Sequence, residues 1–143
     1  MGPMLEQSAT PCRVLLVDDD AGIRALLDMA VSLDTRFELV AAAGTAAEAL
    51  AQALAISYDV ALVDVTLPDG DGIDLIQQLR RTPGDASHVL FTGWSDDEST
   101  LARASAVGVD AVFRKDLSPT QLLDELHRLH LDADELSNAP TAG

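Results

Sequence analysis

Residues 60–63 (Val-Ala-Leu-Val) form an apolar run that leads directly into Asp64 and then into a turn segment rich in Pro, Gly and Asp. A short run of this kind is typical of a strand that is buried on both faces of a parallel sheet. The turn residues that follow indicate that the strand ends at Asp64. Since open α/β sheets bind their ligands at the carboxyl ends of the strands, Asp64 is the first candidate for a functional residue.

Three further apolar runs also end in polar side chains, and each end has a different chemistry. Residues 14–17 precede Asp18, Asp19 and Asp20, residues 88–91 precede Thr92, and residues 111–114 precede Lys115. If these strands are neighbours, their carboxylates converge and repel one another unless a cation lies between them. Such oxygen ligands suit Mg²⁺, and a hydroxyl and an ammonium suit phosphoryl oxygens. The four strand ends therefore predict a magnesium site and phosphoryl chemistry.

The segments between the apolar runs have helical periodicity and capping signals. Thr45 with Glu48, Ser95 with Glu98 and Ser118 with Gln121 are spaced as capping boxes. The apolar stripes comprise Ile23, Leu26, Leu27, Ala30 and Val31; Ala46, Ala49, Leu50, Ala53 and Leu54; Ile73, Ile76 and Leu79; Leu101 and Ala104; and Leu122, Leu123, Leu126 and Leu129. With a further strand at residues 37–41, five strands alternate with five helices. The predicted fold is an α/β domain with a doubly wound, five-stranded parallel sheet and helices on both faces.

Length and composition limit the number of domains in the chain, its location and the classes of partner that it can bind. The 143 residues hold one domain, predicted at residues 13–131, between a disordered head or cloning scar at 1–12 and a mobile polar tail at 132–143. No stretch is apolar enough to span a membrane, and no signal peptide is visible. The single cysteine, Cys12, suits a reducing, cytoplasmic location. A net charge of −15 argues against direct nucleic-acid binding, because phosphate neutralisation requires clustered Lys and Arg.

Four motifs occur in the chain in a fixed order, each at a predicted strand end: VLLVDDD, VALVDVTLPDGDGIDLI, VLFTGW and VFRKD. In order and context they resemble the receiver domains of two-component response regulators, including the chemotaxis regulators. The resemblance covers residues 13–131. It implies a flavodoxin-like sheet with the strand order 2-1-3-4-5.

The resemblance implies a role for the acidic residues at two strand ends. Asp64 matches the aspartate that accepts a phosphoryl group, with Mg²⁺ as cofactor, from a histidine kinase or a histidine phosphotransfer protein. Asp19, Asp64 and the backbone carbonyl of Thr66 match the ligands of the metal. Asp18 matches the acidic neighbour that acts on the metal through water.

Thr92 and Lys115 match the two residues that respond to phosphorylation. Thr92 corresponds to the switch hydroxyl, and Lys115 corresponds to the lysine that pairs with the phosphoryl group. Such a domain catalyses its own phosphorylation and dephosphorylation, changes conformation and signals to a partner, and it is not expected to turn over an external substrate. A homodimer is compatible with the resemblance. The output is open: a free-standing regulator, a phosphorelay shuttle or the receiver of a longer transcription factor.

The chain departs from the family pattern at three places. The position three residues before the lysine, where receivers commonly carry an aromatic, is Val112, and Phe113 is expected on the opposite face of the strand. Asp116 follows Lys115 where proline is usual, so we expect a trans peptide bond there. The family pattern places the bulky Trp94 near the mouth of the site.

Two other classes of protein remain as alternatives. A phosphatase of the haloacid dehalogenase type would use the Asp-x-Asp opening at Asp18, but this chain has no cap insertion and the hypothesis leaves Asp64 unexplained. A pseudo-receiver would have the same fold and would bind a partner without being phosphorylated. The intact set of acids, hydroxyl and lysine argues against that second alternative.

Overall fold

The computed structural model describes residues 10–92 and 98–138, with the side chains of residues 134–138 left out. In chain order the main strands are β1 (Cys12–Val17), β2 (Phe37–Ala43), β3 (Val60–Asp64), β6 (Ser87–Thr92) and β7 (Ala111–Arg114). The helices are α2 (Ala21–Ser32), α3 (Ala46–Ala55), α4 (Gly72–Leu79), α5 (Glu98–Val107) and α6 (Pro119–Asn138). The predicted cap at Ser95, and Trp94 beside it, lie outside the described residues.

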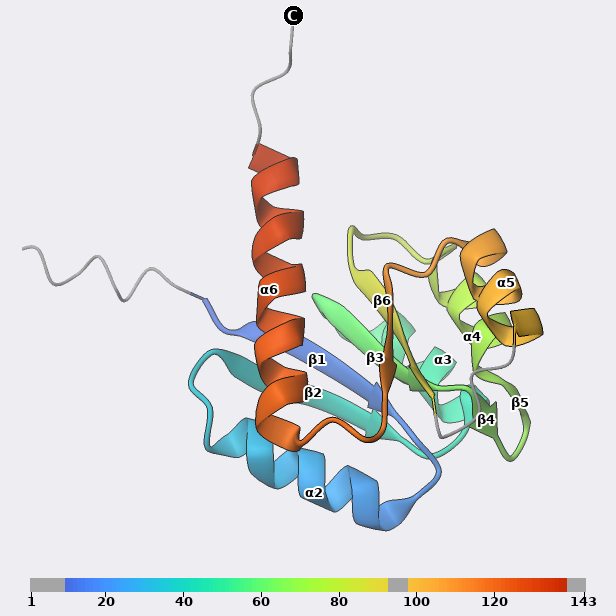
Figure 1. The fold of residues 1–143 in the computed structure, drawn as a ribbon, viewed down its shortest axis with the longest axis horizontal. Helices are drawn as coiled ribbons and strands as arrows, with labels where there is room; N and C mark the ends of the chain where they lie inside the picture. Colours follow the sequence, from blue (N-terminus) through green and yellow to red (C-terminus); the bar gives the residue numbers. More distant parts are fainter. Residues whose placement is uncertain (1–9, 93–97, 139–143) are drawn as a thin grey trace, which may run out of the picture.

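The main strands form one parallel sheet with helices on both of its faces (Figure 1). Their order is β2-β1-β3-β6-β7, which is the expected 2-1-3-4-5 order of five strands. Helices α2 and α6 cover one face, and α3, α4 and α5 cover the other. The fold class predicted from the alternating pattern is therefore confirmed.

Each face of the sheet has its own hydrophobic core, because successive strand residues point to opposite sides. Leu15 packs in the core under α3, α4 and α5, and Leu16 packs in the core under α2 and α6. The central strand β3 is buried at every residue. In β7, Val112 contacts the first core and Phe113 the second, as the strand period predicted.

Capping residues start the helices that lead away from the site. The Thr45 hydroxyl accepts the Glu48 N–H at 3.1 Å, while the Glu48 carboxylate reaches back to the Gly44 N–H at 3.0 Å. Ser118 and Gln121 form a reciprocal box, with bonds of 3.1 and 2.9 Å between each side chain and the partner's backbone N–H. These two predicted capping boxes are thus present. In the first box, the Glu48 carboxylate bonds to the N–H of Gly44, which precedes Thr45, and not to the N–H of Thr45 itself.

Leu101 in α5, predicted to face the core, is 40% exposed, and two further such leucines in α2 and α3 are exposed more fully. The exposed fraction is 51% for Leu26 in α2 and 75% for Leu54 in α3. Each is the chain neighbour of a buried residue, Leu27 and Ala53 respectively, and neighbouring residues on a helix are rotated by about 100° from each other. Each leucine therefore lies at the edge of its apolar stripe, beyond the part that the sheet can cover.

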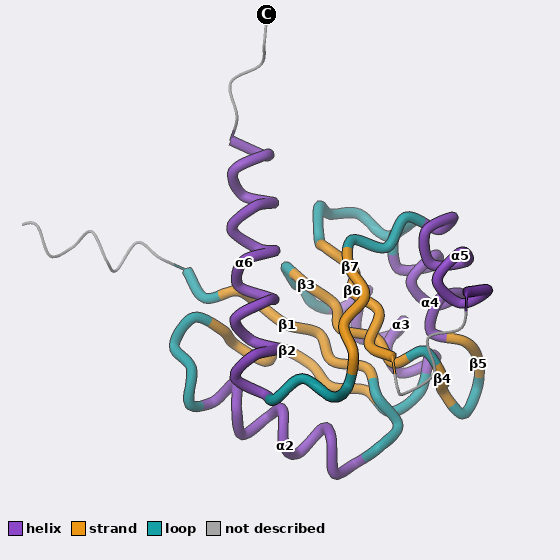
Figure 2. The backbone as a smooth tube through the Cα atoms, in the orientation of Figure 1, coloured by secondary structure: helices purple, strands orange, loops and turns teal. Residues whose placement is uncertain are grey.

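Two stretches differ from the expected secondary structure. Helix α6 runs to Asn138, through the first residues of the predicted polar tail, because residues 132–137 contain Ala, Glu and Leu and neither Gly nor Pro. A small antiparallel hairpin, β4 (Thr66–Leu67) and β5 (Gly70–Asp71), was not predicted. Figure 2 shows it beyond the end of β3.

Two expectations about the backbone are met within the described part of the chain. The Lys115–Asp116 peptide bond is trans. None of the helices in residues 10–92 and 98–138 combines the length and the apolar character needed to cross a membrane.

His88 near the start of β6 is a buried histidine far from the strand ends considered above. Its side chain is 4% exposed, and its Nε2 lies 3.0 Å from the Tyr58 hydroxyl. Burial lowers the pKa of His88 to about 4, with Asp110 acting to raise it and Arg80 to lower it further. The histidine therefore stays neutral in the folded protein at neutral pH.

We predict that protonation of His88 destabilises the fold in mild acid. Its folded pKa lies below the value of about 6.5 for an unfolded chain, so the unfolded state binds more protons and stability falls as pH falls from about 6.5 towards 4. Between pH 7 and pH 5 the wild type should lose about 2 kcal/mol more unfolding free energy than His88→Gln. Urea unfolding of both proteins across this range measures the difference, and parallel pH curves would contradict the prediction.

Candidate functional site

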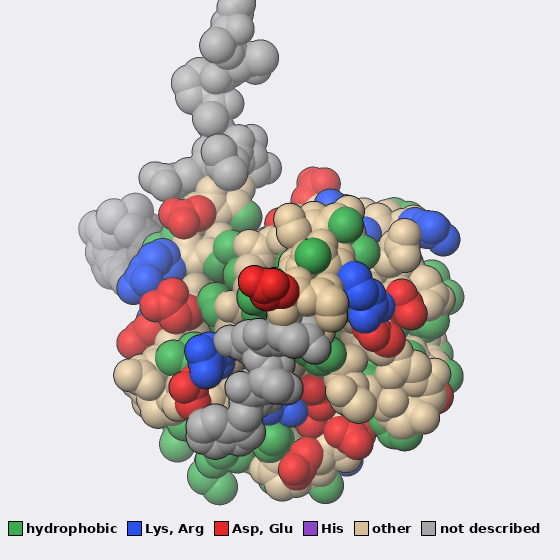
Figure 3. Space-filling model, turned by 45° about the vertical axis from the view of Figure 1, so that its right-hand side comes forward, with side chains coloured by type: hydrophobic (Ala, Val, Ile, Leu, Met, Phe, Trp, Pro, Cys, Tyr) green, Lys and Arg blue, Asp and Glu red, His purple; other side chains and the backbone are tan. Residues whose placement is uncertain are grey.

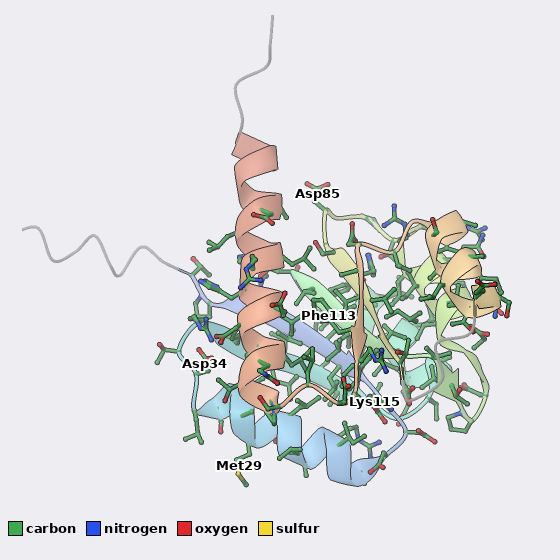
Figure 4. All side chains as sticks on the ribbon, viewed as in Figure 1. Met29, Asp34, Asp85, Phe113 and Lys115 are labelled. Carbon is green, nitrogen blue, oxygen red and sulfur yellow. The ribbon has the colours of Figure 1, made fainter. Side chains whose placement is uncertain are left out.

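Four strands bring polar side chains to the carboxyl edge of the sheet. Asp64 is the last residue of β3, and Thr92 is the last residue of β6. Asp18 and Asp19 follow β1, and Lys115 follows β7, where Figure 4 labels it. Because β1, β3, β6 and β7 are consecutive neighbours in the sheet, residues that are up to 97 positions apart meet at one edge.

Lys115 bridges the two buried carboxylates of this edge. Its Nζ lies 3.1 Å from Oδ2 of Asp18 and 3.1 Å from Oδ2 of Asp64. Burial alone would lower the pKa of Lys115, but its contacts with the two carboxylates outweigh that effect and raise the pKa. The lysine is therefore a fixed positive charge at the centre of the site.

The surroundings of Asp64 disfavour the ionised form of its carboxyl group. Burial raises its pKa, and the charge of Asp18 raises it further, while Lys115 and the N–H of Thr66 act in the opposite direction without cancelling the shift. The Thr66 N–H donates to Oδ1 of Asp64 at 3.3 Å. Two buried acids thus share one partly exposed ammonium, which leaves an excess of negative charge.

The third acid of the edge makes the cluster suitable for a cation. One carboxylate oxygen each of Asp18, Asp19 and Asp64 lies within 4.8 Å of the others, and Asp19 is exposed to solvent. Asp18 is fully buried, and its Oδ1 accepts the N–H of Asp20 at 2.9 Å. Three oxygen donors with an open side fit Mg²⁺, which prefers carboxylates and keeps several waters.

Thr92 and Phe91, the last two residues of β6, both lie beside Lys115. Thr92 is 2% exposed, and its carbonyl accepts the backbone N–H of Lys115 at 2.8 Å. Phe91 packs in the core as expected, and the Lys115 Nζ lies 5.4 Å from the centre of its ring. This cation–π contact could not be predicted from the sequence, because Phe91 looks like any aromatic residue of a buried strand.

The hairpin after Asp64 is bound at its tip to a different helix. The Asp69 carboxylate accepts the N–H groups of Ala46 at 2.7 Å and Ala47 at 3.0 Å, at the start of α3. These bonds lower the pKa of Asp69. Asp69 belongs to the turn segment predicted after Asp64, and it caps a helix that begins 23 residues earlier in the chain.

The base of the hairpin is tied to the next two helices. Asp71 caps α4 through the Ile73 N–H at 2.6 Å, and its other oxygen lies 2.9 Å from Nη1 of Arg103 in α5. The Gly72 N–H donates to the Val65 carbonyl at 2.7 Å. The segment that follows Asp64 is thus linked to α3, α4 and α5.

A side chain that sequence reasoning missed supports the acidic loop after β1. Nη1 of Arg24 in α2 donates to the backbone carbonyl of Asp18 at 2.7 Å. No sequence signal distinguishes this residue, since an arginine in the first turns of an amphipathic helix is usually a solvated surface residue.

Comparison with known proteins gives consistent results. A family model described as the response regulator receiver domain matches residues 14–127. The DNA-binding transcriptional activator DevR/DosR of Mycobacterium tuberculosis is 36% identical over 110 residues, which are 77% of this chain and 50% of that protein. The nitrate/nitrite response regulator NarP of Escherichia coli is 32% identical over 118 residues, 82% of this chain and 54% of that protein. This chain spans about half the length of the curated relatives that it matches.

Solved structures share the fold. The receiver domain of AraT, a response regulator from Geobacillus stearothermophilus, has a TM-score of 0.77 at 27% identity, covering 90% of this chain and 100% of that one. A CheY-like receiver domain protein from Methanospirillum hungatei has a TM-score of 0.79 at 24% identity, covering 89% of this chain and 99% of that one.

We predict that Gly72 is required for steric reasons. A Cβ built at this position would overlap the carbonyl oxygen of Asp64. Gly72→Ala must therefore displace β3 or the start of α4, and we expect a loss of about 3 kcal/mol in unfolding free energy. Guanidinium unfolding measures it. Gly70→Ala is the matched control, because nothing lies within 4 Å of a Cβ there. Equal losses in the two variants would contradict the prediction.

Proposed function

Because the chain belongs to the response regulator receiver domain family, we propose that it accepts a phosphoryl group on Asp64. The donor would be a histidine kinase or a histidine phosphotransfer protein. The proposal rests above all on the placement of Asp64, whose carboxylate lies 3.1 Å from the Lys115 ammonium at the carboxyl edge of the sheet. A carboxylate nucleophile and a fixed cation are the two groups that phosphoryl transfer to an acid needs from a protein.

In the proposed step an oxygen of Asp64 attacks the phosphorus in line with the bond to the donor nitrogen. The new O–P bond forms as the N–P bond breaks, and the bonding electrons leave with the imidazole of the donor. Lys115 holds positive charge near the oxygens that become more negative. Mg²⁺ bound by Asp19, Asp64 and the backbone carbonyl of Thr66, with Asp18 acting through water, would supply additional charge neutralisation.

We propose that Lys115 and Thr92 carry the response to phosphorylation. The phosphoryl oxygens would draw the Lys115 ammonium and the Thr92 hydroxyl towards them. The backbone hydrogen bond between these two residues couples their movements. Phe113 packs on the opposite face of β7 from Val112, so no aromatic of this strand lies on the usual switch side. The response would then depend on the hydroxyl and the lysine.

The output of the domain is also a proposal. The relatives DevR/DosR and NarP are named as a transcriptional activator and a nitrate/nitrite response regulator, and we propose a regulatory output of that kind, through a partner protein or a further domain. Direct contact of this domain with nucleic acid is not part of the proposal. On the face drawn in Figure 3, the described Lys and Arg side chains lie apart, with acidic side chains among them.

The phosphatase alternative makes Asp18 the nucleophile, and exposure favours Asp64 over Asp18 in that role. The Asp64 side chain is 9% exposed, whereas Asp18 is fully buried. One of its carboxylate oxygens bonds to a backbone N–H and the other contacts Lys115. The pseudo-receiver alternative shares every feature of the geometry, and only a phosphorylation experiment separates it from the proposal.

We predict that the purified chain gains one phosphoryl group when incubated with acetyl phosphate and Mg²⁺. Intact-mass spectrometry should show a single adduct that depends on Mg²⁺ and is absent from Asp64→Asn. Asp74→Asn is the matched control, since it makes the same chemical change at an exposed carboxylate of α4 and should still be phosphorylated.

Two outcomes would contradict the proposed function. An adduct that persists in Asp64→Asn would place the acceptor elsewhere. No adduct on the wild type with either acetyl phosphate or phosphoramidate, in a folded protein that binds Mg²⁺, would favour the pseudo-receiver.

A further inference from the structure

Asp19 reaches the acidic cluster without any direct support for its side chain. One of its carboxylate oxygens lies within 4.8 Å of ligand oxygens of Asp18 and Asp64. Within residues 10–92 and 98–138, no hydrogen bond or ion pair is made to that carboxylate. An exposed, unsupported side chain takes its position from its backbone. The orientation of Asp19 therefore depends on the two peptide planes that flank it.

Both flanking peptide planes are held by hydrogen bonds. The carbonyl of the Asp18–Asp19 peptide accepts Nη1 of Arg24 at 2.7 Å. The N–H of the Asp19–Asp20 peptide donates to Oδ1 of Asp18 at 2.9 Å. The first bond restricts rotation on the amino side of Asp19 and the second on the carboxyl side. The Cα–Cβ direction of Asp19 follows from these two restraints.

Arg24 is itself held in a slot between two loops. Its backbone N–H donates to the Asp20 carbonyl at 3.0 Å in the first turn of α2, and this fixes the start of the side chain. At the other end, a Cβ on Gly44 would lie only 3.0 Å from Nη1 of Arg24. The guanidinium thus occupies space that is open because residue 44 has no side chain. Gly44 has no positive φ, so its role here is to leave that space.

We propose that Arg24 is a positioning residue for the metal ligand Asp19. Its guanidinium holds the Asp18–Asp19 peptide in the orientation that brings the Asp19 carboxylate to Asp18 and Asp64. The proposal rests on the proposed Mg²⁺-dependent function of the site. Outer residues that orient metal ligands typically change metal affinity by about 10-fold to 100-fold when they are replaced.

Electrostatics and positioning predict opposite signs for the loss of Arg24. Removing a positive charge near an acidic cluster should strengthen the binding of a dication by Coulomb attraction. Loss of the peptide restraint should weaken it, because Asp19 must then be ordered when the metal binds. The direction of the change in affinity therefore separates a positioning role from a general effect of charge.

The first test is Mg²⁺ binding to the full chain by isothermal titration calorimetry. We expect the dissociation constant of Arg24→Gln to rise about 10-fold, and that of Arg24→Lys to rise less, since lysine keeps one charged donor. Arg128→Gln is the matched control, because it removes the same charge from an exposed residue of α6, and it should bind Mg²⁺ like the wild type. Unchanged or tighter binding by Arg24→Gln would overturn the proposal.

A second variant tests the same contact without changing charge. Gly44→Ala should push the guanidinium away from the Asp18 carbonyl and weaken Mg²⁺ binding severalfold, with thermal unfolding as the check on folding. Wild-type affinity in Gly44→Ala would overturn the proposal even if Arg24→Gln failed to fold. At saturating Mg²⁺ the Arg24→Gln protein should regain the wild-type rate of phosphorylation.

These readouts separate this proposal from the proposed function. A wild-type chain that binds Mg²⁺ but takes no phosphoryl group would refute phosphorylation, while the affinities of the variants still decide the role of Arg24. A wild-type chain that binds no Mg²⁺ would refute the role of Arg24.

Discussion

The contact of Lys115 with Asp18 and Asp64 is the interaction on which the carboxyl edge depends. Two acids buried side by side repel each other, and leaving either charge without a partner would cost several kcal/mol. The Nζ of Lys115, 3.1 Å from each, offsets part of this cost. The contact exists only if β1, β3 and β7 end at one edge. The strand order and the chemistry of the site are therefore two aspects of a single constraint.

The segment that follows Asp64 is bound to the neighbouring helices, so Asp64 is held in place before any ligand arrives. Asp69 links the hairpin to α3, Gly72 allows α4 to approach the Asp64 carbonyl, and Asp71 links the hairpin to Arg103 of α5. Helix α5 buries one residue, Ala104, whereas α4 buries five. With so little apolar packing, α5 depends more on polar contacts such as this ion pair than α4 does.

Sequence reasoning succeeded where a local pattern carries the information. The apolar runs before Asp64 and Thr92 locate their strands, and the spacing of Ser118 and Gln121 locates the start of α6. The order of the strands came from the resemblance, since periodicity gives no order. The hairpin was missed because two-residue strands have no period, and the partners of Asp69 and Arg24 were missed because tertiary contacts select them.

In the proposed function, the position of Lys115 offers a way for phosphorylation of Asp64 to act on β6 and β7 without an aromatic switch. Phosphorylation would move negative charge from the carboxylate outwards onto the phosphoryl oxygens, and the ammonium would follow that charge. The backbone N–H of Lys115 is bonded to the Thr92 carbonyl, so strain on the lysine would pass to the end of β6. Val112 offers no ring on that face of β7 to rearrange. In the proposed function, the hydrogen bond between the ends of β6 and β7 would carry this strain from Lys115 to Thr92.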